Sequence, residues 1–275
     1  IIRVRDQNDI DPDFSTTDIS GFTSQDSAYF LYEAFSNKTY NNAPGIYPNL
    51  FISNDGWGAN DRDVTINKNI IVFGNFEVRG NANYVLPTGT DGDVEIYGDL
   101  IIAQDPDSTG GAEFAFGNTG NDREITVYGD LLLSGEDAKI WVRNPENTDI
   151  ADHIFNLYGN ITQNTTGSND IIRFWTANDE DRVSLNIPGN QSAEYTRPSG
   201  TAPDLYRIIM NKEAASEWVA FNFMDDFTLG GPTDGDEKAI ELISGRLGLR
   251  DPGIDVTLTS GGADFKIPAE AKLWL

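Results

Sequence analysis

The sequence predicts an all-β protein, and within that class a right-handed parallel β-helix. Three observations lead to this prediction: a composition rich in turn-forming residues, an internal repeat with a period of about 30 residues, and alternation of apolar and polar residues inside each copy of the repeat. No part of the repeat shows the 3.6-residue period of an amphipathic helix.

The composition favours turns and gives the chain a strong negative charge. It holds 30 Asp, 25 Asn and 27 Gly among 275 residues, and these residue types favour turns over helices. Asp and Glu outnumber Lys and Arg by 44 to 19, so the formal net charge is −25. Such a charge repels phosphate backbones and anionic membrane surfaces, and no apolar run approaches the ~18–20 residues of a membrane span. We therefore expect neither a nucleic-acid partner nor membrane insertion.

The internal repeat is the strongest pattern in the sequence. Five segments align, with starts 30, 31, 30 and 30 residues apart: residues 64–70, 94–100, 125–131, 155–161 and 185–191. Three of them read apolar-x-apolar-Tyr-Gly-(Asp/Asn)-apolar. A period of this length indicates one supersecondary unit that must stack on its neighbours to bury its apolar face.

Each unit consists of short strands. Val94 and Ile96 point inward by the period-2 rule, and Gly98 permits a positive φ at the corner that follows. Leucine-rich repeats would need a helical arm, and propeller blades would need ~40–45 residues, so we expect β-helix coils. Stacking would then place four residues in one inward column: Ile96, Val127, Leu157 and Ile187.

The same stacking predicts a ladder of polar side chains along one corner. Successive coils lie about 4.8 Å apart, so equivalent Asp and Asn side chains come within reach of one another. Asp99 and Asp130 would repel unless they accept backbone N–H groups or bind a cation. We expect a turn-stabilising ladder, with cation binding as the alternative. Its predicted members are Asn69, Asp99, Asp130, Asn160 and Asn190.

The two ends of the chain depart from the regular coils. Residues 1–22 form an acidic segment, residues 23–60 are expected to hold a capping helix and the first coil, and residues 61–204 carry the ~30-residue repeats. The capping helix is placed at residues 27–36 because Phe30, Leu31 and Phe35 fall on one helical face behind a capping-box-like segment. Residues 205–275 continue the β-helix with divergent repeats, and we expect the chain to be part of a longer polypeptide.

The divergent repeats resemble those of a known group of proteins. Residues 205–212, 221–229, 240–247 and 254–261 are similar to repeats of large secreted and cell-surface β-helix proteins of the Bacteroidota, including adhesin and gliding-type proteins exported by type IX secretion. The resemblance covers residues 60–275 and rests on structural repeats, not on site motifs. It implies an extracellular or cell-surface location, an adhesive role, and the secretion machinery as a partner. Residues 44–47 also resemble the start of pectate-lyase-like β-helices, which include enzymes and adhesins.

The sequence shows no catalytic constellation. It contains no Cys and a single His, His153, so thiolate sites are excluded and a zinc site is nearly so. Hydrolysis of a glycoside needs two carboxylates ~5–9.5 Å apart, and Glu95 has no acidic counterpart in the aligned segments. We predict no catalytic residue, and we expect His153 at the surface or at a coil edge.

The acidic N-terminal segment contains the one metal-like pattern. Asp9, Asp11 and Asp13 have the alternating spacing of a calcium loop, but the Gly and Glu that an EF-hand requires are missing. An acidic linker is the simpler interpretation. We expect no required cofactor and consider calcium the one candidate ion.

Outward positions on two other strands suggest a glycan site. If Ile140 and Ile172 face inward, the residues between the inward positions form an exposed aromatic and cationic platform on neighbouring coils. The alternative is that a loop covers the platform or that the register is slipped. The candidate ligand-binding residues are Trp141, Arg143, Arg173 and Trp175.

These observations favour a non-catalytic structural and adhesive module of a large extracellular protein, with an extracellular polysaccharide as candidate ligand. The first alternative is a polysaccharide lyase or glycoside hydrolase of the pectate-lyase-like β-helix type. The second is an ice- or surface-binding solenoid, which should show outward ranks of Thr.

Overall fold

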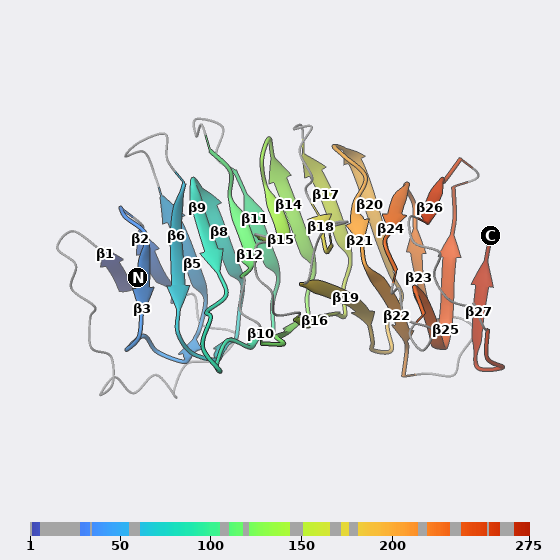
Figure 1. The fold of residues 1–275 in the computed structure, drawn as a ribbon, viewed down its shortest axis with the longest axis horizontal. Coiled ribbons are helices and arrows are strands. Elements are labelled where there is room, and N and C mark those ends of the chain that lie inside the picture. The colour runs from blue at the N-terminus through green and yellow to red at the C-terminus, as the bar shows by residue number, and fades with distance from the viewer. Residues whose placement is uncertain are drawn as a thin grey trace.

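The computed structural model describes residues 2–5, 28–33, 35–54, 61–104, 110–117, 121–143, 151–165, 172–175, 181–213, 219–231, 238–251, 253–258 and 267–275. Within these residues all helix or strand structure is β-strand, and the strands form a parallel β-solenoid of about 7 turns. The predicted fold class is therefore confirmed. Figure 1 shows the strands stacked from the N-terminal end, in blue, to the C-terminal end, in red. None of the described segments is an apolar helix of membrane-spanning length.

Three parallel sheets form the sides of the solenoid. Sheet A contains β1 (Ile2–Arg5), β2 (Phe30–Glu33), β5 (Leu50–Asn54), β8 (Phe76–Gly80), β11 (Leu100–Ala103), β14 (Leu131–Gly135), β17 (Ile161–Thr165), β20 (Ala193–Ser199), β23 (Ala220–Phe223), the second half of β25 (Ile240–Leu249) and β27 (Ala271–Trp274). Sheet B contains β3 (Lys38–Tyr40), β6 (Arg62–Ile66), β9 (Ala82–Val85), β12 (Glu113–Phe116), β15 (Lys139–Val142), β18 (Ile172–Arg173), β21 (Asp204–Leu205), β24 (Phe227–Leu229) and β26 (Val256–Leu258). Sheet C contains β4 (Ile46–Tyr47), β7 (Ile70–Val72), β10 (Val94–Ile96), β13 (Glu124–Val127), β16 (Asp152–Leu157), β19 (Arg182–Ile187), β22 (Arg207–Asn211) and the first half of β25.

Strand β25 joins sheets C and A without a loop. Its first residues pair with β22 in sheet C, and from Gly245 onward it pairs with β27 in sheet A. Gly245 has a φ of 87°, and a Cβ there would lie 2.8 Å from the Lys212 side chain. The bend therefore needs a residue without a side chain.

The core fills the space between the three sheets, and its registers follow the predicted columns. Ile96 is paired with Val127, and Val127 is paired with Leu157. The next coil aligns Asn156 with Asn186, one residue before Leu157 and Ile187. All four predicted column residues are fully buried, so the inward column is confirmed.

The predicted capping helix is wrong. Phe30–Glu33 is strand β2, which pairs in parallel with β1 and β5 at the end of sheet A. Phe30 and Tyr32 are buried on the inner side, and the Tyr32 ring lies 6.3 Å from that of Tyr47. The apolar residues at 30 and 32 fit a period of 2 as well as a helical face, and pairing with β5 decides in favour of the strand.

The predicted phase of the first repeat is also wrong. Val94 is paired with Ile70, not with Val64, and Val64 belongs to sheet B. The step from Asn69 to Asp93 is 24 residues, whereas that from Asp93 to Glu124 is 31. Coil length varies because the connections differ in length, while strands β7, β10, β13, β16 and β19 keep their register.

The corner glycines are needed for space, not for a positive φ. Gly98, Gly129 and Gly159 are not among the residues with positive φ. A Cβ on Gly129 would lie 2.5 Å from the Gly98 carbonyl oxygen, and one on Gly159 would lie 2.3 Å from the Gly129 oxygen. Backbone of one coil thus lies where a side chain of the next would need to be.

Candidate functional site

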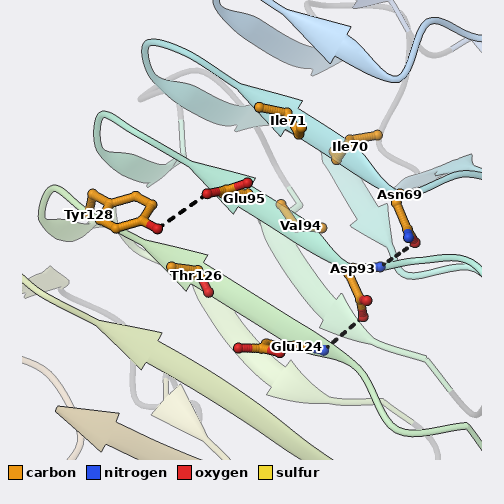
Figure 2. Close-up of a pocket in the computed structure, with 9 residues that line it drawn as sticks. All are labelled: Asn69, Ile70, Ile71, Asp93, Val94, Glu95, Glu124, Thr126 and Tyr128. Carbon is orange, nitrogen blue, oxygen red and sulfur yellow. Dashed lines mark hydrogen bonds between the residues drawn. The ribbon is translucent and has the colours of Figure 1, made fainter. Parts of the chain in front are cut away.

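A groove crosses the outer face of sheet C over three successive coils. It has a volume of about 410 Å³ and is formed by β7, β10, β13 and the residues that flank them. Figure 2 shows the lining side chains, which are apolar, hydroxyl-bearing, amide and carboxylate in kind.

The alternation of each strand places the lining side chains. Val94 is buried on the inner side, so its neighbour Glu95 points outward. Glu95 is paired with Ile71 on the preceding coil and with Thr126 on the following coil. The outer row therefore runs from an apolar side chain to a carboxylate and then to a hydroxyl.

Three carboxylates lie in this groove, and neutral groups position all of them. Asp93 Oδ1 accepts a hydrogen bond from the backbone N–H of Glu124 at 3.0 Å. Glu95 Oε1 accepts one from the Tyr128 hydroxyl at 3.2 Å, and Glu124 Oε1 accepts one from the Asn156 amide at 2.7 Å. None of the three acids makes an ion pair with a described residue. The lining of the groove thus contains three carboxylates and no Lys or Arg among the residues that the structure describes.

A stack of aromatic rings lies beside the groove. Tyr97 and Tyr128 stack with centroids 4.9 Å apart at 21°, and Tyr128 lies 4.8 Å from Tyr158. Because the ring faces pack against one another, the rings present their edges and hydroxyl groups to solvent. Burial and the neighbouring Glu95 raise the pKa of Tyr128 to about 12, so its hydroxyl remains a hydrogen-bond donor at neutral pH. The Tyr-Gly-(Asp/Asn) repeat is the sequence signal for this stack.

The predicted corner ladder is present for three of its five members. Asp99 Oδ1 accepts the backbone N–H of Asp130 at 2.8 Å, and Asp130 Oδ1 accepts that of Asn160 at 2.7 Å. Asn160 in turn accepts the N–H of Glu194 at 3.0 Å. Each side chain thus binds the backbone of the next coil, which is the turn-stabilising arrangement. Asn75 continues this ladder toward the N-terminus by accepting the N–H of Asp99 at 3.0 Å.

The other two predicted members lie elsewhere. Asn69 precedes β7 and accepts the N–H groups of Gly92 and Asp93 at the start of the groove. Asn190 is exposed, and Glu194 takes its place in the ladder because β17 pairs with β20 rather than with residues near 190. Both differences follow from coil lengths that depart from 30 residues.

The four predicted glycan-binding residues face outward, but they do not form the expected exposed aromatic platform. Trp141 is paired with Arg173, whose guanidinium lies 4.4 Å from the centre of the Trp141 ring. Trp175 lies so close to Gly230 that a Cβ there would be 2.1 Å from its ring. Arg143 binds Asp63 at 2.6 Å. Each side chain therefore has an intramolecular partner.

Sheet B brings together an acid–base cluster that the sequence did not reveal. Glu113 on β12 is buried, accepts a hydrogen bond from Trp141 Nε1 at 3.1 Å, and lies 3.6 Å from the Lys139 ammonium. Burial raises the pKa of Glu113, and Lys139 and Trp141 act against that rise. Asp63, which binds Arg143, also accepts the Asn83 amide at 2.9 Å. Alternation within single strands placed these residues outward, but only the register between coils showed which of them meet.

The expected surface position of His153 is wrong. The side chain is fully buried on β16, with its ring 5.3 Å from Phe116. Nδ1 accepts the backbone N–H of Arg123 at 3.1 Å, and burial lowers the pKa of the imidazole to about 4. His153 precedes Phe155 by two residues, so the same alternation that buries Phe155 also buries His153.

The predicted metal residues Asp9, Asp11 and Asp13 lie outside the described residues. Within the part of the chain that the structure describes, no three His, Cys, Asp or Glu side chains are grouped as metal ligands would be. Comparisons with protein families, with curated proteins and with solved structures find no match to this chain.

Proposed function

We propose that this chain is a non-catalytic rod module of an extracellular surface protein and that it binds a polysaccharide along one side of the solenoid. The groove on sheet C is the observation that carries this proposal. It follows the stacking direction over several coils, so a linear polymer can lie along it, and it offers hydrogen-bond acceptors and hydroxyls beside an apolar side chain.

The rigid core suits a module that presents such a surface. The inward columns of sheet C keep their register from β7 to β19, and parallel strand pairs in three sheets hold the described coils together. Binding at one groove would be weak, and display of many copies on one surface would raise the overall affinity. This is the physical basis of an adhesive role, and the resemblance to repeats of large adhesins points to the same setting.

An enzyme of the polysaccharide lyase or glycoside hydrolase type is the alternative, and one observation favours it. The cluster of Glu113, Lys139 and Arg143 places a buried acid with a raised pKa beside basic groups on the outer side of sheet B. Such pKa shifts gather at catalytic sites but also occur in structural ion pairs. We favour the structural role because Glu113 is already bound by Trp141 and Lys139.

A glycan array and a reducing-end release assay on the same preparation test the proposal. We expect binding of at least one extracellular polysaccharide without release of new reducing ends. The absence of binding to any glycan would refute the proposed function. Release that disappears in Glu113→Gln would establish the enzyme alternative.

A further inference from the structure

The charges of the groove select the chemistry of its ligand. Asp93, Glu95 and Glu124 each accept a hydrogen bond from a neutral donor, and the groove lining contains no Lys or Arg. A neutral ligand lying over these carboxylates would remove water from them without supplying a compensating charge. A ligand with ammonium groups would supply that charge and form charge-assisted hydrogen bonds.

The carboxylates are spaced along the direction in which a polymer would lie. Glu95 lies on β10, and Glu124 begins β13 on the next coil. Glu95 is paired with Thr126, whereas Glu124 is level with Asp93, so Glu95 and Glu124 lie on a diagonal across the two strands, roughly 7–8 Å apart. Their hydrogen bonds to Tyr128 and Asn156 fix both carboxylates before a ligand arrives.

The remaining lining fits a sugar better than a basic peptide. Ile71 and Thr126 offer an apolar patch and a hydroxyl group on the row of Glu95, and the Tyr128 hydroxyl reaches Glu95 from beside that row. The groove lies on a sheet face, where strands β7, β10 and β13 already use their backbone groups on one another. A peptide there cannot add as a strand, so its amides would lose water without finding partners. Sugar hydroxyls can donate to the carboxylates instead.

We propose that the groove binds a polysaccharide whose sugars carry free amino groups, with Glu95 and Glu124 each binding one ammonium group of the chain. This inference rests on the proposed function of the groove as a polysaccharide site. Asp93 contributes a third negative charge at the end of the groove near Asn69.

Calorimetric titration with three probes tests the inference. The probes are a β-1,4-linked glucosamine hexamer, the fully N-acetylated hexamer of the same length, and a Lys-rich peptide of the same charge as the first. The groove variant is Glu95→Gln with Glu124→Gln, which keeps side-chain size and hydrogen-bond acceptors. Its control is Glu136→Gln with Glu194→Gln, two exposed acids outside the groove lining, which changes the net charge equally.

We expect the glucosamine hexamer to bind the wild type and the control equally, and the groove variant about tenfold more weakly. The acetylated hexamer and the peptide should bind the wild type at least about tenfold more weakly than the glucosamine hexamer does. Equal binding of the two sugar hexamers would overturn the inference but leave the proposed function standing. Peptide binding as tight as glucosamine binding would overturn it in favour of a basic protein partner. Failure of both sugars, together with an empty glycan array, would remove the proposed function as well.

Discussion

The outer faces of sheets B and C carry acids on neighbouring coils but surround them differently. On sheet B, Asp63 binds Arg143 at 2.6 Å, and the buried Glu113 lies 3.6 Å from Lys139. On sheet C, Glu95 and Glu124 have only neutral donors. Asp63 and Glu113 are therefore compensated within the molecule, whereas the groove acids Glu95 and Glu124 repel one another and can gain a cation from a ligand.

This difference separates structural acids from binding acids. Removing one partner of a buried ion pair leaves the other without compensation, which destabilises a fold strongly. Neutralising an exposed, unpaired acid in a highly negative chain removes repulsion instead. The two faces should thus respond to the same substitution with opposite signs.

The largest expected effect is on sheet B. Glu113→Ala leaves the Lys139 ammonium and the Trp141 N–H without their acceptor, and we expect a loss of about 3 kcal/mol in the free energy of unfolding. The matched change Glu95→Ala on sheet C should alter it by less than about 0.5 kcal/mol. Urea unfolding measures both, and equal losses would show that the two faces do not differ.

A comparable effect is expected in the core that both faces share, and it depends on pH. The folded-state pKa of His153 is about 4 against the usual 6.5, so below 6.5 the unfolded state binds this proton more readily. His153 therefore makes its full contribution to the free energy of unfolding above pH 6.5. This contribution falls as the pH drops toward 4, with a total loss of up to about 3 kcal/mol. The pH-dependent difference in the free energy of unfolding between the wild type and His153→Gln measures this contribution.

The single His of the chain also makes a direct test simple. Its ring proton resonances can be followed by NMR during acidification without assignment of other imidazoles. We expect no titration in the folded protein above about pH 5. A midpoint near 6.5 would mean that the ring is in contact with water and does not pack against Phe116.

A smaller effect is expected at the corner between sheets C and A. Gly129→Ala places a Cβ within 2.5 Å of the Gly98 carbonyl oxygen, so backbone must shift, at a cost of about 1–3 kcal/mol. Gly253→Ala meets its nearest atom, in the Asp251 side chain, at 3.4 Å and serves as the control. If thermal unfolding shows the same midpoint for both variants, the stacking of the corners is looser than described.

The smallest expected effect has the opposite sign. Glu95→Gln with Glu124→Gln should raise the free energy of unfolding by a few tenths of a kcal/mol at low salt, because it removes unpaired negative charge. At 1 M salt, where the Debye length is about 3 Å, the gain should vanish. Chemical unfolding at the two salt concentrations measures it. A loss of stability at low salt would show that these acids are paired in the folded protein.

The fold follows from the sequence because alternation and the repeat fix inside and outside locally. Those signals place Ile96 and Val127 in one column and Trp141 outside. They fail where local pattern is ambiguous, as for Phe30 and Tyr32, whose strand is decided by pairing with β5.

The candidate site was harder to predict, since it depends on the register between coils. The coil between Asn69 and Asp93 is 24 residues long instead of the predicted 30, and this shorter coil places Asn69 at the groove and not in the corner ladder. Glu95 was visible as an outward acid without a carboxylate counterpart, and the structure confirms Thr126 as its neighbour. The proximity of Glu113 to Lys139 required the pairing of β12 with β15, which no single repeat encodes.

A crystal structure of the protein with the glucosamine hexamer tests the central claim most directly, because it shows which face holds the ligand. We predict sugar density along sheet C, with amino groups at Glu95 and Glu124 and a hydroxyl at Tyr128. Density over Trp141 and Arg143 on sheet B, with an empty groove on sheet C, would contradict the account.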